Sequence, residues 1–257
     1  MNYEELYAQL KGLEKDFRDR LNAAQKSYRA IEKQTEAGDL KNLEKELSAL
    51  SDICRAQTQL TESLREAVGS FDSKAYFESG DFAAQLLECC AQDQIDVKGE
   101  FPVYEMFPYR IRIDAENQDV YQNRKKLTGI RPRALSGLIK AGQDKLNKAS
   151  FNDSSFADEL CAAYDLGILK NGKKPGSDLY LTSLYKLLAP MSRYRRDYDA
   201  NAFAFDLARL YISGREETKS GRRFQFGSSR DIGKAIRILD QYGKEQYLVT
   251  ICFYPAQ

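Results

Sequence analysis

The chain has 257 residues, of which 42% are hydrophobic and 30% are charged, and its formal net charge is only +1. This composition is that of a soluble globular protein with enough apolar residues for a core. The sequence contains no histidine, which excludes every nucleophilic triad that depends on a histidine base. No apolar stretch is long enough to span a bilayer and the N-terminus lacks the basic start of an export signal, so we expect a cytoplasmic protein without membrane contact.

The five cysteines indicate neither a disulfide framework nor a metal site. They are scattered along the chain and odd in number, which is typical of reduced, buried thiols. No CxxC pair is present, and the adjacent Cys89 and Cys90 fall in a predicted helix, where neighbouring side chains point in different directions. We therefore expect no structural zinc and no cofactor.

The first 69 residues carry the clearest pattern in the chain. Their apolar side chains recur every three or four residues, as on one stripe of a helix. Gly38 can end a first helix in the left-handed conformation, and Asp39 can cap a second one. The pattern predicts two helices of about 30 residues, each about 45 Å long, folded into an antiparallel hairpin. The apolar positions are Leu6, Leu10, Leu13, Phe17, Leu21, Tyr28 and Ile31, followed by Leu40, Leu43, Leu47, Leu50, Cys54, Leu60, Leu64 and Val68.

This helical hairpin allows two interpretations. It can pack against the body as part of a plain bundle, or it can be a protruding arm, residues 1–69, that docks a protein partner or a second copy. The predicted helices are much longer than the usual helix of about 11–12 residues, and their heptad pattern is sustained. We therefore favour the arm.

After the hairpin, the pattern predicts a body of short strands and helices. Three successive strands are expected to form a hairpin or meander. One later helix, residues 179–189, is apolar on nearly all sides and is expected to be buried. The predicted strands are 103–107, 109–114 and 120–121, and the predicted helices are 81–92, 133–148, 152–169, 179–189 and 203–212.

The C-terminal tail predicts a strand, a helix and a strand. Residues 222–226 and 247–254 are rich in β-forming side chains, and residues 229–242 have a helical pattern. The two strands can lie parallel with a right-handed crossover, or they can extend the meander. The expected fold class is α+β, mostly helical, with a coiled-coil-like antiparallel hairpin over residues 1–70 and an α+β body over residues 71–257 that contains a small antiparallel or mixed sheet.

Positive charge is concentrated in parts of the body. Residues 120–148 hold eight basic side chains and one acidic, residues 215–237 hold seven and three, and residues 71–100 have a net charge of −5. A basic face can contact several phosphates of DNA or RNA, and tyrosines among arginines can stack on bases. The alternative is a solvated face, or arginines that pair with the acidic segment. The candidate nucleic-acid-binding residues are Arg110, Arg112, Arg124, Lys125, Lys126, Arg131, Arg133, Arg193, Arg195 and Arg196.

Residues 227–234, with the sequence Gly-Ser-Ser-Arg-Asp-Ile-Gly-Lys, come nearest to a nucleotide-binding motif. They follow a predicted strand and open a predicted helix, which is the context of a phosphate loop. However, five residues instead of four separate the glycines, and Ala235 stands where a serine or threonine would bind magnesium. A turn with a serine cap explains the segment better. The alternative is a weak phosphate site at the helix N-terminus, made by Ser228, Ser229, Arg230 and Lys234.

One acidic segment offers an enzymatic alternative. Asp96-Val97-Lys98 has the Asp-x-Lys form that suits a metal-dependent nuclease, with Asp93 and Glu100 close in sequence. The same form recurs at residues 39–41 and 72–74, and a catalytic site needs geometry rather than a tripeptide. We predict no catalytic residue and no metal ligand.

The sequence favours a non-enzymatic subunit of a cytoplasmic multi-protein assembly. In this hypothesis the hairpin mediates docking or self-association, and the basic body contacts DNA or RNA. A purely protein-binding adaptor is the first alternative, and a metal-dependent nuclease is the second.

Overall fold

A computed structural model describes residues 1–227 and 232–254 of the chain. By compactness the chain divides into two units. Unit 1 comprises residues 1–92, 113–120 and 126–136, and unit 2 comprises residues 93–112, 121–125 and 137–257. The domain boundary at residue 70 that the sequence suggests stays a prediction.

The fold is α+β and mostly helical, as the sequence predicts. The α-helices are α1 (Tyr3–Ala37), α2 (Leu40–Gly69), α3 (Ser73–Glu78), α4 (Asp81–Gln92), α5 (Pro132–Lys148), α6 (Asp153–Lys170), α7 (Leu181–Leu188), α8 (Tyr194–Asp197) and α9 (Ala200–Ile212). The strands are β1 (Lys98–Glu100), β2 (Val103–Met106), β3 (Tyr109–Asp114), β4 (Asp119–Gln122), β5 (Lys125–Lys126), β6 (Leu179–Tyr180), β7 (Phe224–Gly227), β8 (Ile236–Leu239), β9 (Glu245–Leu248) and β10 (Thr250–Phe253), and η1 (Ile232–Lys234) is a 3-10 helix.

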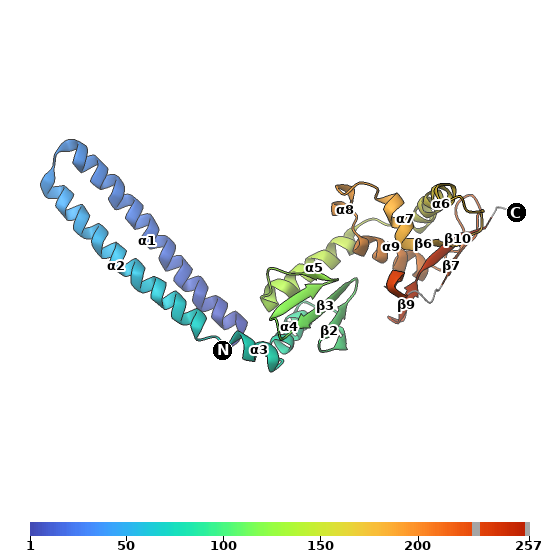
Figure 1. The fold of residues 1–257 in the computed structure, drawn as a ribbon, viewed down its shortest axis with the longest axis horizontal. Coiled ribbons are helices and arrows are strands. Elements are labelled where there is room, and N and C mark those ends of the chain that lie inside the picture. Colours follow the sequence, from blue (N-terminus) through green and yellow to red (C-terminus); the bar gives the residue numbers. More distant parts are fainter. Residues whose placement is uncertain (228–231, 255–257) are drawn as a thin grey trace. The chain divides into compact units, whose positions relative to one another are not determined.

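The predicted helical hairpin is present, with α1 and α2 side by side and antiparallel (Figure 1). Gly38 ends α1 with a φ of 69°, in the left-handed region that favours glycine. Asp39 begins α2, because its carboxylate accepts a hydrogen bond of 3.1 Å from the Asn42 backbone. Both caps confirm the predicted turn. At the other end, a capping box made by Asn2 and Glu5 begins α1.

The hairpin buries little of its own surface. Leu6 is the buried residue of α1 and Ala67 that of α2, and both lie far from the Gly38 turn. Elsewhere the seam is half-buried, because two helices cover each other on one side only. The half-buried seam residues are Leu10, Leu13, Phe17, Ala24, Ser27, Ile31 and Gln34 in α1 and Leu43, Glu46, Leu50, Ile53, Gln57, Leu60 and Leu64 in α2.

The first sheet is a five-stranded meander in the order β1-β2-β3-β4-β5, which confirms the predicted meander. β2 and β3 pair antiparallel, with Glu105 opposite Arg110. In β3 the side chains of Ile111 and Ile113 are buried and those of Arg110 and Arg112 are exposed, as the alternation in the sequence predicts. The strands β1 and β5, of three and two residues, are too short to show a period in the sequence.

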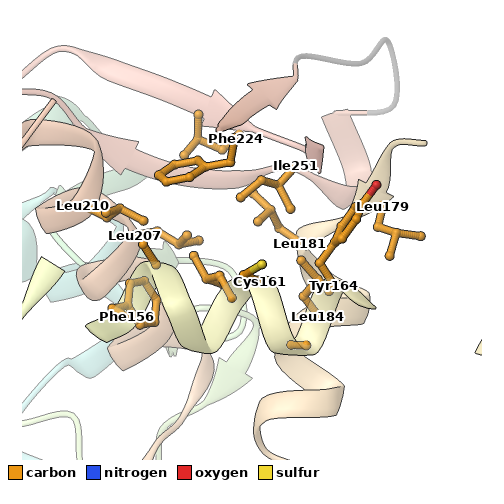
Figure 2. Close-up of a cluster of buried hydrophobic side chains, with 14 of the residues drawn as sticks. Phe156, Cys161, Tyr164, Leu179, Leu181, Leu184, Leu207, Leu210, Phe224 and Ile251 are labelled. Atoms are coloured by element: carbon orange, nitrogen blue, oxygen red, sulfur yellow. The ribbon is translucent and has the colours of Figure 1, made fainter. Parts of the chain in front are cut away.

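Unit 2 is built around an apolar core between the helices α6, α7 and α9 and the sheet β6-β10-β7 (Figure 2). Phe224 and Ile251 project from the sheet toward the helices, and both are buried. Tyr164 is fully buried as well, and its hydroxyl donates a hydrogen bond of 2.8 Å to the Ser177 carbonyl oxygen. Burial of the phenol in this core raises the pKa of Tyr164.

The helix predicted for residues 229–242 is wrong over its described part. Residues 232–234 form η1, and β8 pairs antiparallel with β9 in a two-stranded sheet. The turn between these strands explains the difference, because the Asp240 carboxylate accepts hydrogen bonds of 2.9 Å from the Tyr242 and Lys244 backbones. Gly243 completes the turn with a φ of 71°.

Two further expectations for this part of the chain are wrong. The strands β7 and β10 pair antiparallel in a separate sheet, and so are neither parallel nor an extension of the meander. The helix expected from residue 179 begins two positions later, because Leu179 and Tyr180 form β6 against β10. Tyr180 is therefore the N-cap of α7. The tertiary pairing with β10 overrides the local helical pattern.

Two leucines of α6 provide a test of the core of unit 2. The side chain of Leu160 is fully buried, whereas that of Leu169 is 80% exposed. We expect Leu160→Ala to lower the free energy of unfolding by about 2–5 kcal/mol, because it removes apolar contacts and leaves a cavity. Leu169→Ala is the matched control and should change it by less than about 0.5 kcal/mol. Urea unfolding measures both, and equal effects of the two substitutions would contradict the assigned core.

Candidate interaction surfaces

The start of α1 is held by two arginines within unit 1. A guanidinium nitrogen of Arg131 lies 2.9 Å from the Glu4 carboxylate, and the guanidinium carbon lies 3.7 Å from the centre of the Tyr7 ring. The backbone of Arg133 donates a hydrogen bond of 2.9 Å to the same carboxylate. These contacts combine an ion pair, a cation–π contact and a helix-start hydrogen bond, and so they fix the first turns of the hairpin.

A cluster of aromatic rings in unit 1 contacts the start of α1 and the residues that follow the end of α2. The ring of Tyr3 lies 5.3 Å from that of Phe71 and 5.9 Å from that of Tyr76. The Tyr76 hydroxyl donates to the Gln85 side chain on α4, and burial raises the pKa of Tyr76 to about 12. The Gln85 side-chain oxygen also accepts a hydrogen bond of 3.3 Å from the Tyr3 backbone. The first residues of α1 and the residues after α2 are therefore tied to the same small core.

Farther from this core, the hairpin exposes large apolar side chains. The exposed fraction is 48% for Leu21, 61% for Tyr28, 74% for Leu40 and 50% for Leu47. The apolar stripes predicted from the sequence include these four residues together with Cys54 and Val68, and their expected burial is wrong, because all six are exposed. A helix whose apolar stripe is wider than one seam leaves part of the stripe in water when it has a single neighbour.

A group of basic residues in unit 2 lies along one part of the meander. Arg110 and Arg112 share a face of β3, and the guanidinium carbon of Arg112 lies 4.1 Å from the centre of the Tyr121 ring. Asn123 binds the Arg110 backbone through two hydrogen bonds of 2.7 and 2.9 Å. Arg124 in the turn and Lys125 at the start of β5 follow Asn123, and both are exposed. We call Arg110, Arg112, Arg124 and Lys125 the basic sheet edge.

Other candidate residues have partners within the chain. The Lys126 ammonium lies 2.7 Å from the Asp119 carboxylate, and Arg131 and Arg133 hold the start of α1. The Arg195 side chain donates a hydrogen bond of 2.8 Å to the Ala189 carbonyl oxygen at the end of α7. These partners compete with any phosphate for the same donors.

The last two arginines of the predicted set lie around α8. The guanidinium carbon of Arg193 lies 5.1 Å from the centre of the Tyr194 ring, and Arg196 is exposed. The helix α8 has only four residues and is too short to show a helical period in the sequence. The structure thus interleaves arginine and tyrosine at the surface here, as the sequence suggested, but on a short helix of its own.

The weak phosphate site lies mostly outside the described residues. Ser228, Ser229 and Arg230 are in that undescribed part, and Lys234 belongs to η1. The Lys234 ammonium lies 4.6 Å from the centre of the Tyr180 ring. A strand instead of a helix follows η1, so the described residues lack the helix N-terminus on which the phosphate hypothesis depended.

The acidic segment around β1 lines a small pocket of about 180 Å³ in unit 2. Asp96 and Lys98 lie there beside Glu105 and Arg237, and the Lys98 ammonium donates to the Gly243 carbonyl oxygen. Burial raises the pKa of Glu105, although Arg237 forms an ion pair with it. Within residues 1–227 and 232–254, no group of three or more aspartate, glutamate or cysteine side chains is placed to hold a metal ion.

Comparison with protein-family models, with curated proteins and with solved structures gives no match for this chain. Among the described helices, none combines the length and the apolar character that crossing a membrane requires. The assignment of function to the hairpin and to the basic sheet edge therefore rests on the contacts and exposure of these residues alone.

Substitution of Arg131 tests its role as an anchor. We expect Arg131→Ala to lower the free energy of unfolding by about 1–2 kcal/mol, because the ion pair with Glu4 and the ring contact with Tyr7 are half-buried. Arg131→Lys keeps the charge but loses the planar contact, and it should lower stability less. Arg124→Ala, at an exposed position, is the control for loss of an arginine. Urea unfolding and hydrogen exchange in the first turns of α1 measure the effect, and equal values for the two alanine variants would disprove the anchor.

Proposed function

We propose that this chain is a non-enzymatic subunit of a multi-protein assembly, and that the hairpin of α1 and α2 docks a protein. The observation that carries the proposal is the row of exposed apolar side chains on an anchored, elongated hairpin, among them Leu21, Tyr28 and Leu47. These side chains are about half exposed, so covering the rest of each contributes on the order of 1 kcal/mol, and clustered apolar side chains at a surface mark protein contact sites. The base of the hairpin, where Tyr3 and Phe71 lie, is fixed within unit 1. This favours docking, since a rigid element loses little conformational entropy on binding.

A pair of substitutions on α2 tests the docking function. In cells that express the tagged full chain, Leu47→Glu should abolish recovery of the assembly, because it puts a charge into the apolar row. Ala49→Glu adds the same charge at an exposed position two residues away, on a different side of the helix, and should leave recovery unchanged. Quantitative mass spectrometry after native purification measures the outcome. The same co-purifying proteins in the same amounts for both variants would contradict a docking role for the hairpin.

We infer that the basic sheet edge contacts the phosphates of DNA or RNA. Two observations support this second function: Arg110 and Arg112 share one face of β3, and Asn123, which precedes Arg124 and Lys125, is hydrogen-bonded to Arg110. The Arg112 guanidinium, held on the Tyr121 ring, offers a flat surface on which a base can stack. A carboxylate oxygen of Glu105 lies 3.1 Å from Arg110, so a phosphate competes with it for this guanidinium.

Charge reversal at the basic sheet edge tests nucleic-acid contact. We expect the triple variant with glutamate at positions 112, 124 and 125 to bind a labelled RNA or DNA strand about tenfold more weakly or worse at low salt. The slope of affinity against salt should also fall, because fewer counterions are released. The control reverses Lys170 and Lys174, two exposed lysines elsewhere in unit 2. Fluorescence anisotropy measures both, and wild-type protein that does not bind at low salt would remove this function.

A further inference from the structure

The large exposed apolar residues of the hairpin, together with Cys54, recur at spacings of seven or fourteen residues. In α1 they are Leu21, Tyr28 and Tyr7, whose ring also contacts Arg131, and in α2 they are Leu40, Leu47, Cys54 and Val68. Tyr7, Tyr28, Leu47, Cys54 and Val68 each follow a buried or half-buried residue of the seam, and Leu21 and Leu40 continue the same seven-residue series, so the seven form one heptad row on each helix. Polar residues complete the two rows, Glu14 and Thr35 on α1 and Thr61 on α2.

Both rows lie on the same face of the hairpin. Two antiparallel helices are related by a pseudo-twofold axis perpendicular to the plane that contains them, and this rotation exchanges equivalent heptad positions without changing the face. Because α1 ends at Ala37 and α2 begins at Leu40, Leu21 lies about level with Cys54, and Tyr28 about level with Leu47. We call the two rows together the docking face.

A hairpin with this pattern has the apolar positions of a helix bundle. A two-stranded coiled coil needs two apolar positions per heptad, whereas a helix in a four-helix bundle needs a third beside them. The docking face supplies that third position on both helices. We propose that a second copy of this chain covers the docking face, so that two hairpins form an antiparallel four-helix bundle. The inference rests on the proposed docking function and names its partner.

A twofold axis that lies between the two copies, and runs across both helices at the level of Leu21 and Cys54, makes the docking face self-complementary. Leu21 then lies opposite Leu21 of the second copy, and Cys54 lies opposite Cys54. The same rotation brings Leu40 opposite Val68 of the second copy, so that the most exposed leucine of the hairpin meets an exposed valine. Isologous contacts of this kind are the commonest way in which identical chains associate.

The charges beside the docking face match the same axis. Lys11 and Arg65 flank its basal half, nearer Leu6 and Ala67, and Glu32 and Glu44 flank its distal half, nearer the Gly38 turn. In the antiparallel arrangement Lys11 lies opposite Glu32 of the second copy, and Arg65 opposite Glu44. Lys11 and Arg65 pair with glutamates on their own helices, yet all these side chains are exposed, so they can share their charge. Such pairs at the rim fix the direction of packing.

The size of the docking face is sufficient for a stable dimer. A helix of 30 residues, the length of α2, is about 45 Å long, and two helices side by side are about 20 Å wide. The face therefore offers roughly 900 Å² per copy, compared with about 800 Å² per partner in a protein interface of standard size.

The first test is the molar mass of the purified full chain by sedimentation equilibrium. We expect a dimer for the wild type and for Ala49→Glu. For Leu21→Glu and Leu47→Glu we expect the dissociation constant of the dimer to be at least about 100-fold larger. Both leucines are about half exposed, so the variants should keep the wild-type circular dichroism. A monomeric wild type, or a dimer that both glutamates leave intact, would overturn the inference.

The second test uses Cys54, which is exposed while the other four cysteines are buried. Because the proposed axis passes beside Cys54, a short bismaleimide should join two copies through their Cys54 thiols. Cys54→Ser is the control and should give no covalent dimer. If sedimentation shows a dimer but no Cys54 cross-link forms, the antiparallel arrangement is wrong.

A charge exchange tests the same arrangement without cysteine chemistry. Lys11→Glu combined with Arg65→Glu should weaken the dimer about tenfold or more at low salt, and so should Glu32→Lys combined with Glu44→Lys. The fourfold variant should restore it, since each pair is then reversed. Failure of this rescue would contradict the pairing.

The outcomes separate this inference from the docking function. If the purified chain is monomeric but recovery of its assembly from cells depends on Leu47, the hairpin docks a different protein and the self-association is disproved. If the purified chain is a dimer through Leu47 and its recovery with other proteins is unaffected by Leu47→Glu, the second copy is the partner and the wider assembly is not held by the hairpin.

Discussion

The whole structure of the hairpin depends on one constraint: two helices can bury only one seam between them. α1 and α2 place their half-buried residues there, such as Phe17 and Leu60, and the next heptad row stays in water. Exposed apolar rows reduce solubility and are usually purged from surfaces that have no partner. A row that holds Leu21, Tyr28 and Leu47 on one face is therefore best explained by an occupant of that face.

The seam buries few side chains fully, and the contacts at the base of the hairpin add to its stability. The side-chain amide of Gln57 is buried in the seam and, among the described residues, forms no hydrogen bond. A polar residue at such a position costs stability and specifies the alignment of the helices. The rings around Tyr76 and the Arg131–Glu4 ion pair fix the end of the hairpin that is opposite the Gly38 turn. The hairpin is therefore held in place by contacts at its base as well as by its seam.

The sequence correctly predicted the elements that are determined by neighbouring residues in the chain. The ends of the hairpin helices followed from Gly38 and Asp39, and the two faces of β3 followed from alternation. The apolar stripe of the hairpin was visible too, but periodicity shows how wide a stripe is and not how much of it a neighbour covers. Leu21 and Leu47 were for that reason assigned to the seam. The tail was misassigned because the Asp240–Lys244 turn and the pairing with β9 decide its structure, and neither has a helical or strand period.

The basic residues show the same division between local and distant causes. Sequence alone could place Arg110 and Arg112 on one face, since their neighbours in β3 are apolar. It could not show that Arg131 binds Glu4, because the two lie 127 positions apart and charge composition carries no information on pairing. When an arginine donates its hydrogen bonds to partners within the fold, fewer of its donors remain for a phosphate. Among the predicted basic residues, Arg110, Arg112, Arg124 and Lys125 lie together where the β4–β5 turn meets β3, and Arg110 shares its guanidinium with Glu105 there.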